Sequence, residues 1–314
     1  MADNNFWEKI EKPIFALAPM AGIADSAFRR ICKGFGADVL YSEMASATAL
    51  VYNPGKTLEL LQSDRKEAPY IAQLFGSNPD HFAKAVRLLS RKKQQFRLPD
   101  GIDINFGCPV PKIFKQGAGA ALMRNLKQAR EVIKAVLGNT DLPVSIKLRA
   151  KSGEIDCLMF LDYMKDLPIS AAMIHGRTLA QGFGGPVDRE IIKKARNYFG
   201  GIILANGGAM SARDAFDLLE KTKAGGVGIA RGALGRPWLF REMKNKKAEV
   251  KGAKEIFKIA LKHAKLAEKL KGKQGIIEMR KHLCWYVRGL PGASEMRSEL
   301  ARVESLEDVK NILK

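Results

Sequence analysis

Residues 103–109 combine residue types and a spacing that could carry a reaction. An apolar run ends at Asn105, and the lone Cys108 follows between Gly107 and Pro109. Glycine and proline favour a turn, so we expect the Cys108 thiol at the carboxyl end of a strand rather than inside it. Free cysteines are also among the most buried residues, so packing in the core is the alternative for this stretch taken alone.

Two glycine-rich stretches could bind an anion. Residues 206–208 (Asn-Gly-Gly) and 230–232 (Ala-Arg-Gly) each follow an apolar run. Glycines let backbone N–H groups approach an anion, and Arg231 would add a charge-assisted hydrogen bond. Glycines at strand ends more often serve tight turns. The sequence contains neither G-x-G-x-x-G nor G-x-x-x-x-G-K-[ST], which argues against a Rossmann dinucleotide domain and a P-loop.

Lys147 and His175 lie at or near the ends of two consecutive apolar runs. Both could place positive charge beside an electron-rich ring, and a cation near the N1/O2 edge of a flavin stabilises the reduced anion. The alternatives are a lysine that extends from a rim into solvent and a histidine that hydrogen-bonds to neighbouring backbone.

Eight apolar, β-rich runs would position these residues. Their ranges are 14–18, 39–42, 70–74, 102–105, 144–148, 171–174, 201–205 and 227–230. Most precede a segment with helical spacing of apolar residues, such as 79–91 and 126–137. This alternation indicates a parallel sheet covered by helices. Eight units predict an α/β fold of the (β/α)8 TIM-barrel class, with a doubly wound open sheet as the rival.

In such a barrel the active site lies at the carboxyl ends of the strands, where the residues named above would meet. The loops after strands seven and eight commonly hold a phosphate, and the two glycine-rich stretches occupy these positions. This arrangement favours a mononucleotide such as FMN over NAD or ATP.

The pattern changes after residue 238. Residues 245–314 contain lysine- and arginine-rich segments of helical period, such as 253–271 and 275–287, and no convincing strand. We therefore expect a TIM-barrel domain over residues 1–242 and a small all-helical domain over residues 243–314.

The chain is strongly basic, with 53 basic and 33 acidic residues and a net charge of +20. Such an excess attracts polyanions, and nucleic acid is the leading candidate. A membrane surface is less favoured because no lipidation signal is seen. The alternative is that the net positive charge only keeps the protein soluble.

Cysteine spacing and the first residues suggest the compartment. The four cysteines form no C-x-x-C pair and no zinc-finger spacing, which predicts a reduced protein without metal. No signal peptide or membrane span is recognisable. We expect a cytoplasmic monomer without a stable protein partner.

The chain carries a set of motifs in a fixed order: Ala18-Pro19-Met20-Ala21-Gly22, Gln73-Leu74-Phe75-Gly76, the 103–109 stretch, Lys147-Leu148-Arg149, His175-Gly176-Arg177-Thr178, Asn206-Gly207-Gly208 and Arg231-Gly232. This set closely resembles the bacterial, FMN-dependent tRNA-dihydrouridine synthases. The resemblance runs from about residue 13 to the end, and residues 280–292 look like the family's helical tRNA-binding domain. Asn-x-Gly-Cys-Pro, followed by Lys112 and the glycine-rich residues 116–123, is the most specific part.

The resemblance implies a flavin-dependent reduction of the uracil 5,6 double bond in tRNA. NADPH would first reduce FMN, hydride would pass from flavin N5 to uracil C6, and Cys108 would protonate C5 as the catalytic acid. A cysteine on a loop suits that role, and the carboxyl-end face is large enough for an extruded base.

The resemblance also assigns the other site residues. FMN would lie against Pro19, Met20 and Ala21, with Gln73, Lys147 and His175 at its ring system or ribityl chain. Its phosphate end would be held by Asn206, Gly207, Gly208, Ala230 and Arg231. Asn105 and Arg177 are candidates for reading the uracil edge. The chain departs from the family at Ala230, Phe183 and Arg189, where glycine, tyrosine and tryptophan are more usual.

Two other functions stay open. An FMN barrel that oxidises or reduces a free small molecule, of the dihydroorotate dehydrogenase kind, would share the flavin residues but gives no account of the basic helical tail. A non-catalytic RNA-binding protein would leave Cys108, Lys147 and His175 without a common purpose.

Overall fold

The structure is a computed structural model that describes residues 5–90 and 97–314, and its centre is a closed barrel of eight parallel strands. The strand order around the barrel is β1-β10-β9-β8-β5-β4-β3-β2. The barrel strands are β1 (Ile14–Leu17), β2 (Val39–Ser46), β3 (Tyr70–Phe75), β4 (Gly101–Asn105), β5 (Val144–Arg149), β8 (Ala171–His175), β9 (Ile202–Asn206) and β10 (Gly226–Ile229). Each coincides with a predicted run, so the TIM barrel is confirmed and the open sheet is wrong. A hairpin of β6 (Lys151–Ser152) and β7 (Ile155–Asp156), which the sequence did not predict, follows β5.

Side chains alternate between the two faces of the barrel wall. On β4, Ile102 and Ile104 point outward into the main hydrophobic core, while Asp103 and Asn105 point inward. The lower interior is filled by a separate apolar cluster that includes Ile14, Tyr41, Met173 and Leu204. The polar inward residues therefore lie above an apolar floor, near the carboxyl ends of the strands.

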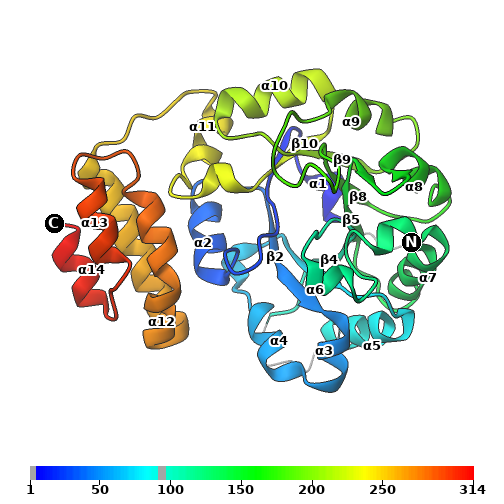
Figure 1. Cartoon of the computed structure of the whole chain (residues 1–314), viewed down its shortest axis with the longest axis horizontal. Helices are drawn as coiled ribbons and strands as arrows, with labels where there is room; N and C mark the ends of the chain where they lie inside the picture. The colour runs from blue at the N-terminus through cyan, green and yellow to red at the C-terminus, as the bar shows by residue number, and fades with distance from the viewer. Residues whose placement is uncertain (1–4, 91–96) are drawn as a thin grey trace.

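Helices surround the barrel, as Figure 1 shows. They are α1 (Phe6–Lys9), α2 (Ser26–Gly34), α3 (Ala47–Tyr52), α4 (Pro54–Leu60), α5 (Pro79–Leu89), α6 (Pro111–Phe114), α7 (Leu126–Leu137), α8 (Cys157–Tyr163), α9 (Arg189–Ala195), α10 (Ala212–Thr222) and α11 (Leu239–Asn245), with short 3-10 turns η1 (Arg65–Glu67), η2 (Leu122–Arg124) and η3 (Arg231–Ala233). Side chains of Asp25, Asn78 and Asn125 cap α2, α5 and α7. Helix α7 has its predicted bounds, and the last residue predicted for α5, at position 91, lies outside the described residues.

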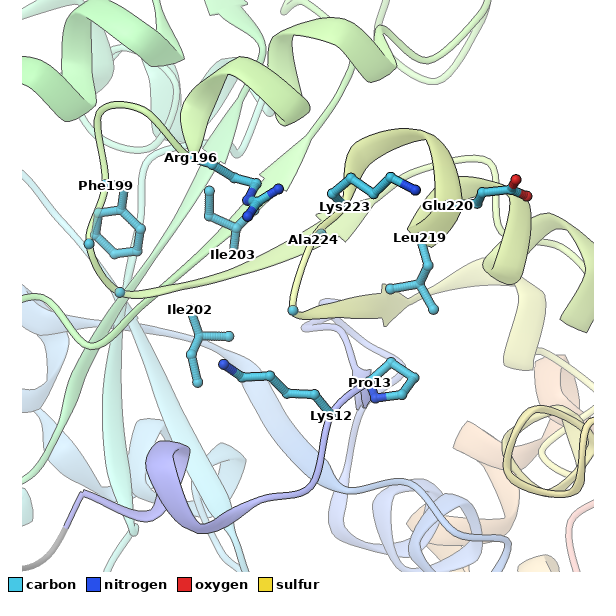
Figure 2. Close-up of a pocket in the computed structure, with 13 residues that line it drawn as sticks. Lys12, Pro13, Arg196, Phe199, Ile202, Ile203, Leu219, Glu220, Lys223 and Ala224 are labelled. Atoms are coloured by element: carbon cyan, nitrogen blue, oxygen red, sulfur yellow. The ribbon is translucent and has the colours of Figure 1, made fainter.

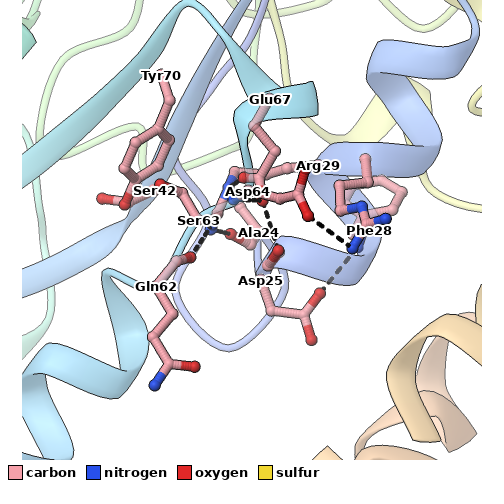
Figure 3. Close-up of polar contacts among 12 residues, drawn as sticks. Ala24, Asp25, Phe28, Arg29, Ser42, Gln62, Ser63, Asp64, Glu67 and Tyr70 are labelled. Atoms are coloured by element: carbon pink, nitrogen blue, oxygen red, sulfur yellow. Dashed lines mark hydrogen bonds and ion pairs between the residues drawn. The ribbon is translucent and has the colours of Figure 1, made fainter. Parts of the chain in front are cut away.

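A buried ion pair holds α2 against the barrel. Arg29 Nε lies 2.6 Å from Glu67 Oε2, and both side chains are fully buried. Arg29 also donates to the carbonyl oxygens of Ala24 (2.6 Å) and Gln62 (2.5 Å), and its guanidinium lies 4.7 Å from the centre of the Tyr70 ring. Figure 3 shows these groups converging on the loop that leads from β1 into α2. The end of this loop, η1 and β3 are thus tied together.

The chain after α11 is helical. It contains α12 (Ala253–Tyr286), α13 (Ala293–Leu300) and α14 (Leu306–Ile312). Helix α12 contacts α2 and carries α13 and α14 on its far side, as Figure 1 shows. Gly272 interrupts α12 with a non-helical φ of 57° and ψ of −144°, so the chain forms two helices, close to the predicted segments. The halves pack closely enough that a Cβ on Gly275 would meet the Ala267 carbonyl oxygen at 2.2 Å.

The helical region has its own hydrophobic core, to which the barrel contributes Ala27 and Trp238. The predicted division between residues 242 and 243 falls inside α11, and residues 246–252 lead from α11 to α12. The domain boundary stays a prediction. No helix in the described part of the chain is long and apolar enough to cross a membrane.

Candidate active site

A cavity of about 380 Å³ opens at the carboxyl ends of the barrel strands. Every residue predicted for the site lines it: Pro19, Met20, Ala21, Gln73, Asn105, Cys108, Lys147, His175, Arg177, Asn206, Gly207, Gly208, Ala230 and Arg231. These residues are distant in sequence, and the closure of the barrel brings them together. Their individual roles stay predictions.

Cys108 lies on the loop after β4, with a relative exposure of 9%. The Asn105 side-chain oxygen accepts the N–H groups of Gly107 (3.0 Å) and Cys108 (2.9 Å), so the strand end fixes the turn that carries the thiol. From the other side, the Ala120 N–H donates to the Cys108 carbonyl oxygen at 3.0 Å. The backbone at residue 119 also lies close to Cys108, and a Cβ there would lie 2.8 Å from the Cys108 carbonyl oxygen, which explains the glycine.

The surroundings of Cys108 favour a thiol that keeps its proton. Burial raises the pKa of Cys108, whereas the Val110 backbone N–H and the charges of Arg149 and Lys147 act in the opposite direction. The group is therefore protonated at neutral pH, and a thiolate formed by proton donation would be stabilised by two nearby cations. These are the properties of a general acid.

Lys147 and His175 differ in charge. Burial and the neighbouring Arg149 lower the pKa of Lys147 to about 8, so it is mostly protonated at pH 7. Burial and the charges of Lys147 and three arginines lower the pKa of His175 to about 2. The expectation of positive charge at both positions is therefore wrong for His175, because burial and then the neighbouring cations oppose its protonation.

The two glycine-rich loops have the backbone expected of an anion cradle. Gly207 and Gly208 have φ values of 105° and 76°, which L side chains rarely adopt. The Asn206 side-chain amide donates to the Gly228 carbonyl oxygen at 2.7 Å and so ties the loop to β10. Gly208 lines the cavity, and its N–H donates to no acceptor in residues 5–90 and 97–314, so it is available to a ligand.

Arg149, which the sequence analysis quoted in a motif without giving it a role, also lines the cavity. Its Nε donates to the Gly107 carbonyl oxygen at 2.8 Å, and its Nη1 donates to the carbonyl oxygens of Thr178 (3.1 Å) and Gly182 (2.9 Å). Arg149 thus joins the Cys108 loop to the loop after β8. The period-two alternation on β5, which turns Lys147 inward, predicts the same orientation for Arg149.

The loop after β8 is organised by Arg177. Its Nε lies 3.0 Å from the carbonyl oxygens of both Gly184 and Gly185, and its Nη1 lies 3.3 Å from His175 Nε2. Phe183 on this loop is 59% exposed and lines the cavity, with the Arg231 guanidinium 4.9 Å from its ring centre. Phe183 is thus an aromatic wall of the site that the sequence reasoning had noted only as a departure from the family.

A wider cavity, of about 920 Å³, lies at the opposite end of the barrel, between the amino ends of β1, β9 and β10. Figure 2 shows Lys12, Arg196 and Lys223 around it, and all three side chains are exposed. It contains none of the predicted residues. Because TIM-barrel active sites lie at the carboxyl ends of the strands, we assign the site to the smaller cavity.

Comparisons of the sequence agree on one family. A family model described as dihydrouridine synthase (Dus) matches residues 16–314. The chain is 33% identical over 305 residues to the probable tRNA-dihydrouridine synthase 1 of Synechocystis sp., covering 94% of this chain and 84% of that protein. It is 32% identical over 300 residues to tRNA-dihydrouridine synthase B of Pseudomonas syringae pv. tomato, covering 93% of this chain and 87% of that protein.

Solved structures share the barrel. Histamine dehydrogenase from Rhizobium sp. 4-9 aligns with a TM-score of 0.56 and 14% identity over 80% of this chain and 48% of that chain. The old yellow enzyme homologue from Zymomonas mobilis aligns with a TM-score of 0.53 and 13% identity over 76% of this chain and 90% of that chain. At such low identity these likenesses show the fold alone.

Proposed function

The chain belongs to the dihydrouridine synthase family, and from this premise we propose that it reduces the 5,6 double bond of uridines in tRNA, with FMN as its flavin and NADPH as its reductant. The observation that carries the proposal is the position of Cys108, a protonated thiol on the wall of a cavity lined by cations and glycine-rich loops. Relatives named tRNA-dihydrouridine synthase cover most of the chain and support the same substrate.

The residues of the cavity fit a flavin mononucleotide. Its volume lies within the range of small-molecule sites. Met20 and Met44 offer apolar surface to a ring system, while Arg231 and the Gly208 amide offer donors to a phosphate. One phosphate-binding region without a dinucleotide fingerprint supports a mononucleotide.

The chain's own groups suit the proton half of the reduction. When bound and reduced, the flavin supplies a hydride to uracil C6. The Cys108 S–H bond then breaks, its proton forms the new bond to C5, and the sulfur keeps the electron pair as a thiolate. Lys147 and Arg149 stabilise that thiolate, since both already lower the pKa of Cys108.

His175 and Lys147 then have different tasks. Because Arg177 Nη1 can only donate, Nε2 of the neutral His175 accepts from it at 3.3 Å, which leaves the Nδ1–H group as a donor for a ligand. Lys147, mostly protonated at pH 7, stabilises negative charge on an electron-rich ring beside it. Asn105 and Arg177 remain our candidates for the uracil edge.

The charge of the protein supports a tRNA substrate. A net charge of +20 favours phosphate contacts, and we propose α12–α14 as the helical tRNA-binding domain, over residues 243–314. The target uridine has to leave its stack to reach Cys108 in a cavity at the barrel mouth. The cytoplasmic location and the monomeric state stay predictions.

The test is a map of dihydrouridine in tRNA from cells with and without the protein. We expect defined uridines to lose the modification when the gene is deleted and to regain it with the wild-type protein, but not with Cys108→Ala. Identical maps would contradict the proposal. Identical maps together with a yellow, flavin-loaded protein would instead favour a flavin barrel that acts on a free small molecule.

A further inference from the structure

A row of polar side chains crosses the barrel interior beneath the Cys108 loop. The strand register places Gln73, Asp103 and Ser145 side by side on β3, β4 and β5. Gln73 Nε2 donates to one Asp103 carboxylate oxygen at 2.7 Å, and Ser145 Oγ donates to the other at 2.6 Å. The Asp103 side chain is fully buried and does not line the cavity. Its carboxylate therefore acts on the site only through its neighbours.

The row continues to the backbone of Cys108. Asn105 lies two residues after Asp103 on the same face of β4. Asn105 Nδ2 donates to Gln73 Oε1 at 2.9 Å, and Asn105 Oδ1 accepts the N–H groups of Gly107 and Cys108. An unbroken chain of hydrogen bonds thus runs from the Asp103 carboxylate through two carboxamides to the turn that carries the thiol.

The two ends of this chain dictate how both carboxamides are oriented. A carboxylate only accepts, so Gln73 has to present Nε2 to Asp103 and Oε1 to Asn105. Backbone N–H groups only donate, so Asn105 has to present Oδ1 to Cys108 and Nδ2 to Gln73. The two requirements agree where Gln73 meets Asn105. If residue 103 offered no acceptor, Gln73 would lose the contact that fixes which end of its carboxamide faces Asn105.

We propose that Asp103 is a positioning residue for the reaction: its buried carboxylate orients Gln73 and Asn105 and thereby holds the backbone that carries Cys108. The inference rests on the proposed function, because the place of the thiol matters in that reaction. Asp103 would then control catalysis although it contacts neither the cavity nor the Cys108 thiol.

The charge state of Asp103 suits this role. Burial raises the pKa of Asp103 to about 6, although the hydrogen bonds from Ser145 and Gln73 and the charge of Lys147 act in the opposite direction. The group is therefore mostly a carboxylate at neutral pH. Its charge in turn raises the pKa of Lys147, against the larger effect of burial.

Two substitutions at Asp103 separate orientation from space filling. Asp103→Leu keeps the number and branching of the side-chain heavy atoms but offers no acceptor. Asp103→Asn can turn its oxygen to Gln73 and its amide to Ser145 Oγ, since a hydroxyl accepts as well as donates. We expect Asp103→Leu to lower kcat for dihydrouridine formation about 10- to 100-fold with an unchanged KM for tRNA, and Asp103→Asn to retain most of kcat. Equal kcat values in the two variants would overturn the proposal.

An exchange of carboxylate and carboxamide tests the same chain without turnover. Asn105→Asp alone places carboxylates at both ends of Gln73, so one contact between two oxygens is unavoidable. Adding Asp103→Asn reverses the chain: position 105 then accepts from Gln73 Nε2 and from both backbone N–H groups, and the carboxamide at 103 donates to Gln73 Oε1. The double variant should therefore be more stable than Asn105→Asp alone.

The measurements are the thermal midpoint and the alkylation rate of Cys108 by iodoacetamide, followed by mass spectrometry of its peptide, with Asp103→Asn alone as the matched control. We expect the second substitution to restore both values toward those of the wild type. Additive losses would overturn the proposal. Neither measurement needs tRNA, so a failure of the proposed function and a failure of this inference would be told apart.

Discussion

Replacing Cys108 tests the proton half of the reaction in the most detail. General acid catalysis by a positioned side chain contributes about 10²- to 10⁴-fold, which corresponds to about 2.7–5.5 kcal/mol of activation free energy. His175 is neutral, so Lys147, with a pKa of about 8, is the other acid among the predicted site residues, and the loss measures what the position of the Cys108 thiol contributes beyond it. We therefore expect Cys108→Ala to lose about 10²- to 10⁴-fold in turnover.

The assay is a single turnover, in which NADPH-reduced protein is mixed with tRNA that lacks dihydrouridine. Cys108→Ala should retain flavin, its reduction by NADPH and tRNA binding, since it removes one sulfur atom and keeps the backbone hydrogen bonds to Asn105 and Ala120. Cys108→Ser should lose a similar factor, because a hydroxyl is a far weaker acid than a thiol. Cys284→Ser is the matched control, since Cys284 lies on α12 outside the cavity. Dihydrouridine formation at a near-normal rate in Cys108→Ala would refute the assignment.

Three further results follow from the structure. Glu67→Ala should lower the free energy of unfolding by about 3–5 kcal/mol, because it leaves the buried Arg29 without its partner; an unchanged urea midpoint would contradict this. Lys147 loses its proton as the pH rises through about 8, so kcat should decline above that pH in the wild type and show no such decline in Lys147→Met. A pH profile with the same alkaline limb in both proteins would exclude Lys147 as its source. The affinity for tRNA should fall steeply as the salt concentration rises, because a basic protein binds phosphates by releasing counterions. An affinity independent of salt would contradict binding through phosphate contacts.

Local sequence was sufficient for the fold and for much of the site. Apolar runs of strand length alternate with amphipathic segments, and each run became a barrel strand because its outward residues pack under a helix. Since all parallel strands end at one face, the residues after each run had to meet there. Cys108 and the glycine-rich loop at 206–208 could be placed without any knowledge of contacts.

The features that could not be predicted from the sequence depend on contacts between residues that are distant in sequence. The sequence analysis considered Asn105 on β4 and Lys147 on β5. Asp103 lies two residues before Asn105, Arg149 lies two residues after Lys147, and both point inward. Only the strand register shows which groups they contact. The charge of His175 depends on its burial and on nearby cations from other elements, so its residue type alone could not predict it. The break at Gly272 in α12 could be placed approximately, but not the tight packing of Gly275 against Ala267.

Conversion of tRNA by the purified protein tests the central claim most directly. Protein loaded with FMN is incubated with NADPH and with tRNA that lacks dihydrouridine, and the tRNA is digested and analysed by mass spectrometry. We predict a gain of two hydrogens at defined uridines, with one NADPH oxidised for each, and no such gain with Cys108→Ala. Oxidation of NADPH by the flavin-loaded protein while the uridines stay unchanged would contradict the claim.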